Sequence, residues 1–261
     1  MKNNILMLLL SALLVACAQQ PAQKQTKGTH EKYVFQYPQK PMNKELTVIQ
    51  KQKATPVSFI KWLSEADHEA RANSYQSFLL QQGVAGFIPQ HEFLQSARDW
   101  QKCGVSEFEV PPREIWPNIV PTLQIIKQLS SQQVISDYTV TSVYRNFNLN
   151  RCAKGAASSR HIFNAAVDFR IGSEFPDSNE LKAIEKTKQR LCAFWQEHGA
   201  AYKMGLGVYS SGQIHIDSAG YRTWGTDHRN TSSPCSAQPE QPAYISHEIQ
   251  KKQRLNLNSA L

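Results

Sequence analysis

The chain has 261 residues, enough for one sizeable domain with tails, and a formal net charge of +8. Its lysines and arginines are scattered rather than gathered on one recognition element, which argues against a nucleic-acid-binding protein. A cationic surface is better matched to anionic wall polymers and lipid head groups.

The N-terminal residues predict export and a membrane anchor. Lys2 precedes an apolar run over residues 5–16, which is too short to span a bilayer and has the form of a secretory signal. The run leads into Cys17 through Leu-Val-Ala, which resembles a bacterial lipoprotein signal. The resemblance implies cleavage after residue 16 and acylation of Cys17, and the alternative is an ordinary signal peptide with a cysteine near its cleavage site. Because Ala18 rather than Asp follows, it also implies the periplasmic face of the outer membrane of a Gram-negative bacterium.

Composition divides the rest of the chain into three parts. Residues 17–55 contain the acylated Cys17 and a stretch rich in Gln, Lys, Pro and Thr without an apolar period, which predicts a flexible tether. A single domain, expected to be monomeric, follows over residues 56–232. Residues 233–261 form a polar C-terminal tail.

Apolar spacing predicts helices in the first half of the domain. Between Val57 and Arg98, aromatic and aliphatic side chains recur at intervals of three and four residues, the period of a helix with one buried face. Pro121 is expected to begin another helix, because proline suits a first helical turn. Leu123, Ile126 and Leu129 form the apolar face of that helix.

The second half of the domain is predicted to contain four strands and one long helix. β-branched and aromatic residues predict strands over residues 138–144, 165–171, 207–209 and 213–217, with a loop over 151–159. Asp177 and Glu180 form a capping-box pattern for a helix that ends near Gly199. The last two strands form a hairpin around a Ser-Ser-Gly turn. The fold class is therefore α+β, a small antiparallel sheet with packed helices.

Four cysteines follow Cys17, and in an exported chain they predict two disulfides. Sequence alone allows three connectivities. We favour Cys103–Cys152 and Cys192–Cys235. No Cys-x-x-Cys pair occurs, so a thiolate zinc site is not expected.

His161, Asp168 and His215 form the most informative set of residues. Two imidazoles and one carboxylate are the ligand set of a catalytic zinc site with one position left for water. Alternate side chains of a strand share a face, so Ile214 and Ile216 are expected in the core while His215 points to the other side. Asp168 lies on the second predicted strand, and His161 precedes it in a loop.

The sequence around these residues resembles the M15 family of zinc D-Ala-D-Ala peptidases. That family shares a fold with murein endopeptidases and the hedgehog signalling domain. The resemblance covers a core over residues 116–225 and depends on Ser159-Arg160-His161, on Asp168, and on the later His215-Ile216-Asp217. It implies a hedgehog/DD-peptidase-like fold and one zinc ion held by His161, Asp168 and His215. It also implies that Arg145 and Ser159 lie beside the substrate.

Three side chains near the expected zinc site have alternative roles. Arg145 is able to grip a carboxylate or a developing oxyanion with two N–H groups, or it forms a surface ion pair. Ser159 either donates to the substrate or caps a turn. Gln213 shares a face with His215, where it either orients the substrate or is simply exposed to solvent.

The chain departs from the family at Gly212. Several relatives have a glutamate at this position, three residues before the last zinc histidine, where it acts as the general base. Asp217 is the nearest carboxylate by strand geometry, and it is expected either to be the base or to hold the ring of His215. Asp227 and His228 are weaker candidates.

These observations predict a zinc peptidase that hydrolyses D-amino-acid amide bonds of peptidoglycan stem peptides with metal-activated water, as a carboxypeptidase or an endopeptidase. The alternative is a zinc-bearing lipoprotein that binds peptidoglycan without cutting it, which the glycine at position 212 favours. A serine enzyme based on Ser58 and Lys61 is a third reading, because these residues match Ser-x-x-Lys. No Ser-Asp-Asn or Lys-Thr-Gly motif accompanies them.

Overall fold

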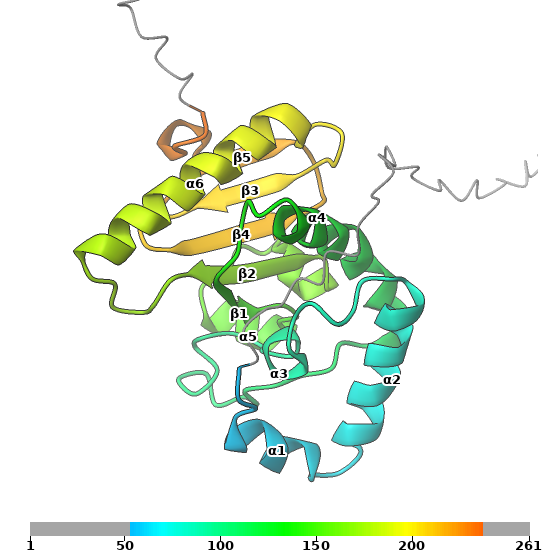
Figure 1. Ribbon diagram of the computed structural model, residues 1–261. Coiled ribbons are helices and arrows are strands. Elements are labelled where there is room, and N and C mark those ends of the chain that lie inside the picture. The colour runs from blue at the N-terminus through cyan, green and yellow to red at the C-terminus, as the bar shows by residue number, and fades with distance from the viewer. Residues whose placement is uncertain (1–52, 237–261) are drawn as a thin grey trace, which may run out of the picture. The chain divides into compact units, whose positions relative to one another are not determined.

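A computed structural model describes residues 53–236, and the expected signal, Cys17 and all but the end of the tether lie outside this range. The described residues form a five-stranded sheet in the order β1-β2-β4-β3-β5 (Figure 1). The strands are β1 Tyr138–Ser142, β2 Ala166–Ile171, β3 Gly205–Val208, β4 Gln213–Asp217 and β5 Arg222–Trp224. Three neighbouring pairs are antiparallel and β3–β5 is parallel. The predicted α+β class is confirmed.

Helices precede, interrupt and cover the sheet. They are α1 Val57–Leu63, α2 His68–Gln81, α3 Gln90–Phe93, α4 Val120–Ser131, α5 Phe147–Cys152 and α6 Ser178–His198, with 3-10 turns η1 Arg113–Ile119, η2 Arg160–Phe163 and η3 Asn230–Ser232. In Figure 1, α4 and α6 lie on the same face of the sheet. None of the helices between residues 53 and 236 has the length and hydropathy of a membrane-spanning segment.

The predicted helical region from Val57 to Arg98 consists of three separate helices. Gly83 and Gly86 adopt positive φ angles after α2, and residues 94–112 contain no regular helix. The two glycines separate α2 from α3, and the expectation of helix up to Arg98 is wrong after Phe93.

The helix expected at Pro121 is confirmed as α4, with Leu123, Ile126 and Leu129 fully buried. The loop expected over residues 151–159 is partly wrong, since α5 extends to Cys152. Asn146 caps α5 by accepting a hydrogen bond from the backbone N–H of Leu149 at 2.9 Å.

Helix α6 begins at the expected cap. One carboxylate oxygen of Asp177 accepts from the backbone N–H groups of Asn179 and Glu180, each at 2.8 Å. Glu180 does not return this contact to Asp177. It accepts instead from the hydroxyl of Ser173 at 2.7 Å, so only half of the predicted capping box forms.

Register between β2 and β4 brings the polar residues of the two strands together. Asp168 pairs with His215, and Ala166 pairs with Asp217. Ile214 and Ile216 are fully buried in the hydrophobic core, as the alternation predicted. Next to Asp168, the β1–β2 ladder shifts register between Val140 and Ser142.

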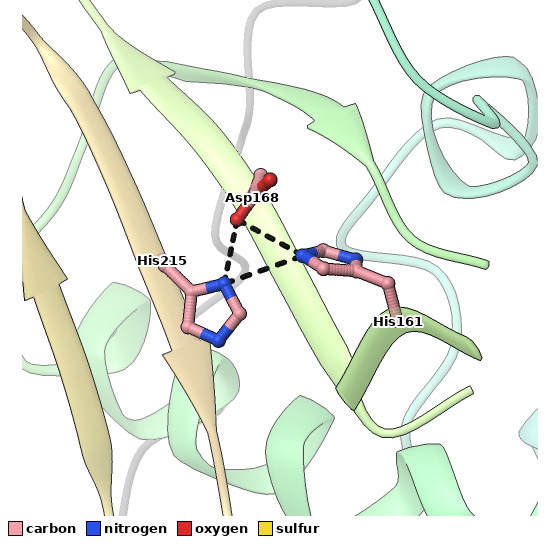
Figure 2. Close-up of side chains that lie close together, drawn as sticks. All are labelled: His161, Asp168 and His215. Carbon is pink, nitrogen blue, oxygen red and sulfur yellow. Dashed lines mark hydrogen bonds and ion pairs between the residues drawn. The ribbon is translucent and has the colours of Figure 1, made fainter. Parts of the chain in front are cut away.

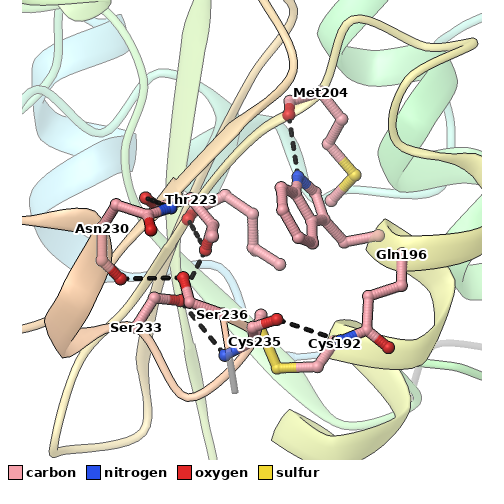
Figure 3. The surroundings of a disulfide bond; sticks show 10 residues. Cys192, Gln196, Met204, Thr223, Asn230, Ser233, Cys235 and Ser236 are labelled. Carbon is pink, nitrogen blue, oxygen red and sulfur yellow. Dashed lines mark hydrogen bonds between the residues drawn. A yellow bond between two sulfur atoms is a disulfide. The ribbon is translucent and has the colours of Figure 1, made fainter. Parts of the chain in front are cut away.

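Both disulfides have the favoured connectivity. Cys103 bonds Cys152 at the end of α5, and Cys192 of α6 bonds Cys235. Figure 3 shows how the second bond attaches the segment after η3 to α6, beside a hydrogen bond from Gln196 to the carbonyl of Cys235 at 3.0 Å. The residues between β5 and Cys235 are thereby fixed to the domain.

Candidate metal centre

Three side chains from separate elements meet at one point (Figure 2). His161 comes from η2, Asp168 from the middle of β2 and His215 from the middle of β4. The Oδ1 atom of Asp168 lies 2.8 Å from His215 Nδ1 and 3.1 Å from His161 Nε2. The two imidazole nitrogens are 3.2 Å apart.

Hydrogen bonds on the outer side of each ring determine which nitrogen faces this point. His161 Nδ1 lies 2.6 Å from the carbonyl oxygen of Val143, which only accepts, so Nδ1 is the donor. His215 Nε2 lies 3.0 Å from the carboxylate of Asp217 and donates to it. The lone pairs of His161 Nε2 and His215 Nδ1 are therefore directed at the same place as Asp168 Oδ1.

This arrangement could hold a metal ion. Three electron-pair donors so close together repel one another unless a proton or a cation lies between them. Ligand atoms about 2.0–2.1 Å from a tetrahedral zinc ion are separated by about 3.3 Å. The three observed separations, 2.8, 3.1 and 3.2 Å, are within about 0.5 Å of that value.

Burial and charge give the three groups different pKa values. Burial lowers the pKa of His161 to about 4, and the positive charge of Arg145 acts in the same direction. Burial alone would also lower the pKa of His215, but hydrogen bonds to Asp168 and Asp217 outweigh it and raise the value to about 9. Burial would raise the pKa of Asp168, yet the neighbouring imidazoles and Arg145 hold it well below its usual range.

Arg145 contacts the carboxylate of the candidate metal centre. Its Nη2 is paired with Asp168 Oδ2, the oxygen that does not face the histidines. Its Nε donates to the hydroxyl of Ser142 at 2.8 Å. Arg145 also lines the cavity described below, but its guanidinium is engaged in orienting Asp168. The sequence-based alternatives were a grip on the substrate and a surface ion pair, and neither included this contact.

Asp217 supports His215 from behind. The side chain is fully buried, and its carboxylate accepts from His215, from the backbone N–H of Ala219 at 2.8 Å and from Arg222 Nη1 at 3.0 Å. Burial would raise its pKa, but these contacts, with His215 first, lower it to about 2. Of the two roles expected for Asp217, this environment favours holding the ring of His215.

A side chain is excluded at position 212. A Cβ atom built on Gly212 would lie 2.1 Å from the carbonyl oxygen of Ile171. The backbone is fixed there, because the Ile171 N–H donates to the Gly212 carbonyl at 2.8 Å. The glutamate that several relatives have at this position does not fit this backbone.

The candidate metal centre opens into a cavity of about 500 Å³. Arg145, Ser159 and His228 line it together with His161, Asp168 and His215. Gln213 does not line it. Its amide is buried and donates to Thr141 Oγ1 at 2.6 Å, so the suggested substrate contact and the suggested solvent exposure are both wrong. Asp227, Ser58 and Lys61 also lie outside the cavity lining.

Several further residues of the cavity were not predicted, among them Arg160, Tyr209, Arg222, Thr223 and Trp224. The last three form β5, a strand for which no element was predicted. Three residues are too few for a strand alternation to be recognised in the sequence. Tyr209 follows β3 directly and accepts a hydrogen bond from Trp224 Nε1 at 3.2 Å.

One comparison with known proteins finds a family model that matches part of the chain. Residues 89–217 match the family model described as Peptidase M15. The match supports the M15 peptidase family. It includes His161, Asp168 and His215 and ends at Asp217, so β5 and His228 lie beyond it. No curated protein matches the chain, and no solved structure does. An M15 assignment supports a peptidase, and it makes the three converging groups a candidate metal site of that enzyme.

Proposed function

We propose that this protein is a zinc peptidase that hydrolyses D-amino-acid amide bonds in peptidoglycan stem peptides, as a D,D-carboxypeptidase or an endopeptidase. The observation that carries the proposal is the convergence of His161 Nε2, Asp168 Oδ1 and His215 Nδ1 at the wall of a cavity, within a segment that matches the M15 family. Two imidazoles and a carboxylate favour zinc over magnesium or calcium, which prefer oxygen ligands.

The residues around the site would have separate roles in the reaction. A zinc ion bound there would polarise the substrate carbonyl and lower the pKa of water at its open position. Val143 and Asp217 keep the two imidazoles in the tautomers that direct a lone pair inward. Arg145 holds Asp168 with one oxygen turned to the histidines. Ser159 lines the cavity, and its hydroxyl would position the peptide.

The alternative function is binding of peptidoglycan without cleavage. Gly212 favours it, because the backbone excludes a carboxylate at the position where several relatives have their general base. The two carboxylates that line the cavity, Asp168 and Asp217, are both engaged by arginines. A binder with a zinc site and no base would retain the fold and the metal.

Digestion of purified peptidoglycan sacculi separates the two functions. Incubation with the protein should release new peptide fragments, detected by liquid chromatography and mass spectrometry, and a chelator should abolish them. His215→Ala should be inactive, whereas His198→Ala, which removes a partly exposed imidazole on α6, should be as active as the wild-type protein. Retention on sacculi without new fragments would instead establish the binder.

We also propose that the protein is a monomer anchored to the periplasmic face of the outer membrane through an acylated Cys17. The basis is the sequence of the N-terminal segment, which lies outside the described residues. Cys17→Ala should move the protein from the membrane fraction to the soluble periplasmic fraction. Membrane association that persists in Cys17→Ala would contradict the anchor.

A further inference from the structure

The proposed hydrolysis requires a general base, because water must lose a proton as it attacks an amide. The carboxylates and imidazoles that line the cavity are Asp168, Asp217, His161, His215 and His228. The first four are engaged. They contact one another, and arginines pair with both carboxylates. Of these five groups, the imidazole of His228 is therefore the one still available to accept a proton.

The side chain of His228 has no polar partner in the described part of the chain. Its imidazole makes no hydrogen bond and no ion pair with any residue between 53 and 236. A neutral imidazole has one nitrogen that donates and one that accepts, and both are free here. The cavity wall therefore presents one unengaged imidazole, while the backbone at Gly212 excludes the carboxylate of several relatives.

A row of aromatic side chains leads from the candidate metal centre to His228. The Trp224 ring lies 5.2 Å from the His215 ring, centroid to centroid, and its Nε1 donates to the Tyr209 hydroxyl. The Tyr209 ring in turn lies edge-on to the imidazole of His228, with centroids 6.0 Å apart. A Cβ atom on Gly207 would lie 2.7 Å from Trp224 Nε1, so the glycine leaves room for the indole. These contacts link the position of His228 to that of His215.

The turn that carries His228 holds this residue in a conformation that costs free energy. Its φ angle is 62°, in the left-handed region that residues other than glycine seldom adopt. The N–H of His228 donates to the carbonyl of Gly225 at 3.0 Å, and the N–H of Gly225 donates to the carbonyl of Arg229 at 3.2 Å. Asp227 accepts from the backbone N–H of Arg229 at 2.9 Å. Backbone strain that neighbouring contacts maintain in this way is concentrated at functional positions of proteins.

We propose that His228 is the general base and general acid of the hydrolysis. Its unprotonated nitrogen accepts a proton from water while the water oxygen forms a bond to the amide carbon. The same nitrogen then donates that proton to the amide nitrogen as the C–N bond breaks, so the imidazole returns to its initial state. The inference rests on the proposed function. It places the base beyond the segment that matches the M15 family, which ends at Asp217.

Substitution by glycine tests this role and leaves the turn intact, because glycine adopts a left-handed φ without strain. The substrates are diacetyl-L-Lys-D-Ala-D-Ala and cross-linked muropeptide dimers, and the assay uses whichever of them the full-length wild-type protein cleaves. In His228→Gly, kcat should fall by about hundredfold or more while KM changes little. Added imidazole should restore part of the lost activity, because it supplies the same base to the space that the side chain occupied.

Gln133→Gly is the matched control. Gln133 also has a left-handed φ, 56°, and it is exposed and lies outside the cavity lining. Its replacement should leave kcat unchanged. Both glycine variants should unfold thermally at or above the wild-type midpoint, since each relieves a strained φ angle.

Two equilibrium measurements do not depend on turnover. The zinc content of His228→Gly should equal that of the wild-type protein, because a base is not a metal ligand. A phosphinate peptide, in which a tetrahedral phosphorus replaces the scissile carbonyl carbon, imitates the product of water attack. Calorimetry should show that it binds zinc-loaded His228→Gly about ten- to hundredfold more weakly than the wild-type protein, the usual effect of losing one hydrogen bond to a charged oxygen.

The outcomes separate this inference from the proposed function. A wild-type protein that cleaves substrate, with His228→Gly equally active or binding the phosphinate equally well, would overturn the role of His228 and leave the peptidase standing. Loss of zinc from His228→Gly would also overturn it, because the residue would then be a ligand. A zinc-loaded wild-type protein that cleaves neither substrate would contradict the proposed function, and the role of His228 with it.

Discussion

The outer nitrogen of His215 donates to Asp217, whose other contacts are Ala219 and Arg222. Asp217→Asn preserves the shape of this group but removes its charge. Groups that orient a metal-ligand histidine typically contribute ten- to hundredfold to metal affinity, so we expect Asp217→Asn to weaken zinc binding by about that factor. Competition with a chromophoric chelator measures it. Asp227→Asn, the same change at a carboxylate outside the cavity lining, should leave the affinity unchanged.

The raised pKa of His215 predicts how zinc affinity depends on pH. In the metal-free protein this pKa is about 9, so below pH 9 zinc must displace a proton from the imidazole. Affinity should therefore fall about tenfold for each pH unit between 9 and 7, while His161, with a pKa of about 4, remains neutral. Zinc titrations at several pH values test the slope. An affinity that is constant between pH 7 and 9 would show that His215 does not carry this proton.

At the level of residues, the sequence predicted the three side chains that converge but not the contacts that hold them. His161, Asp168 and His215 could be selected from the sequence alone, because two imidazoles and one carboxylate are a typical zinc-ligand set. Ser142 pairs with Asp168 after a register shift in β1, and neither this shift nor the contact of Arg145 with Asp168 is marked by a sequence pattern. The exposure predicted for Gln213 was wrong because strand alternation predicts only the face of the sheet on which a side chain lies. It does not predict that Thr141 accepts a hydrogen bond from the Gln213 amide.

Where β2 ends, Gly212 and Ile171 pair through their backbones, and a side chain at position 212 would collide with the Ile171 carbonyl oxygen. Gly212→Ala should therefore lower the free energy of unfolding by about 1–3 kcal/mol, the usual cost of forcing extra atoms into a packed site. Urea denaturation measures the difference. Ser210→Ala, at a nearby exposed position, should stay within about 0.5 kcal/mol of the wild-type protein. Equal stability of Gly212→Ala and the wild-type protein would mean that the two strands separate easily here.

Long elements were predicted from the sequence, and short ones were missed. The apolar period of α4, the Asp177 cap of α6 and the alternation of β4 are signals that local physics imposes. The six-residue α5 and three-residue β5 have too few residues for a period to emerge. Both flank the cavity: all three residues of β5 line it, and α5 precedes the segment that carries Arg160.

At the scale of the whole molecule, the Cys192–Cys235 disulfide closes a loop with a sequence separation of 43 residues, which includes β3, β4 and β5. Replacing both cysteines by serine should lower the free energy of unfolding by about 2–4 kcal/mol, because the unfolded chain regains the entropy of that loop. Chemical denaturation of the double variant under non-reducing conditions measures the loss. An unchanged denaturation midpoint would mean that the segment after η3 is held to α6 by other contacts.

Zinc content and affinity test the central claim most directly. After dialysis against zinc-containing buffer and removal of free metal, elemental analysis of the wild-type protein should find one zinc ion per chain, consistent with the three ligand atoms that converge from η2, β2 and β4. His161→Ala, Asp168→Ala and His215→Ala should each bind little or none, while His198→Ala should retain the full amount. A wild-type protein without zinc, or substitutions of the three residues that leave its zinc content unchanged, would contradict the account.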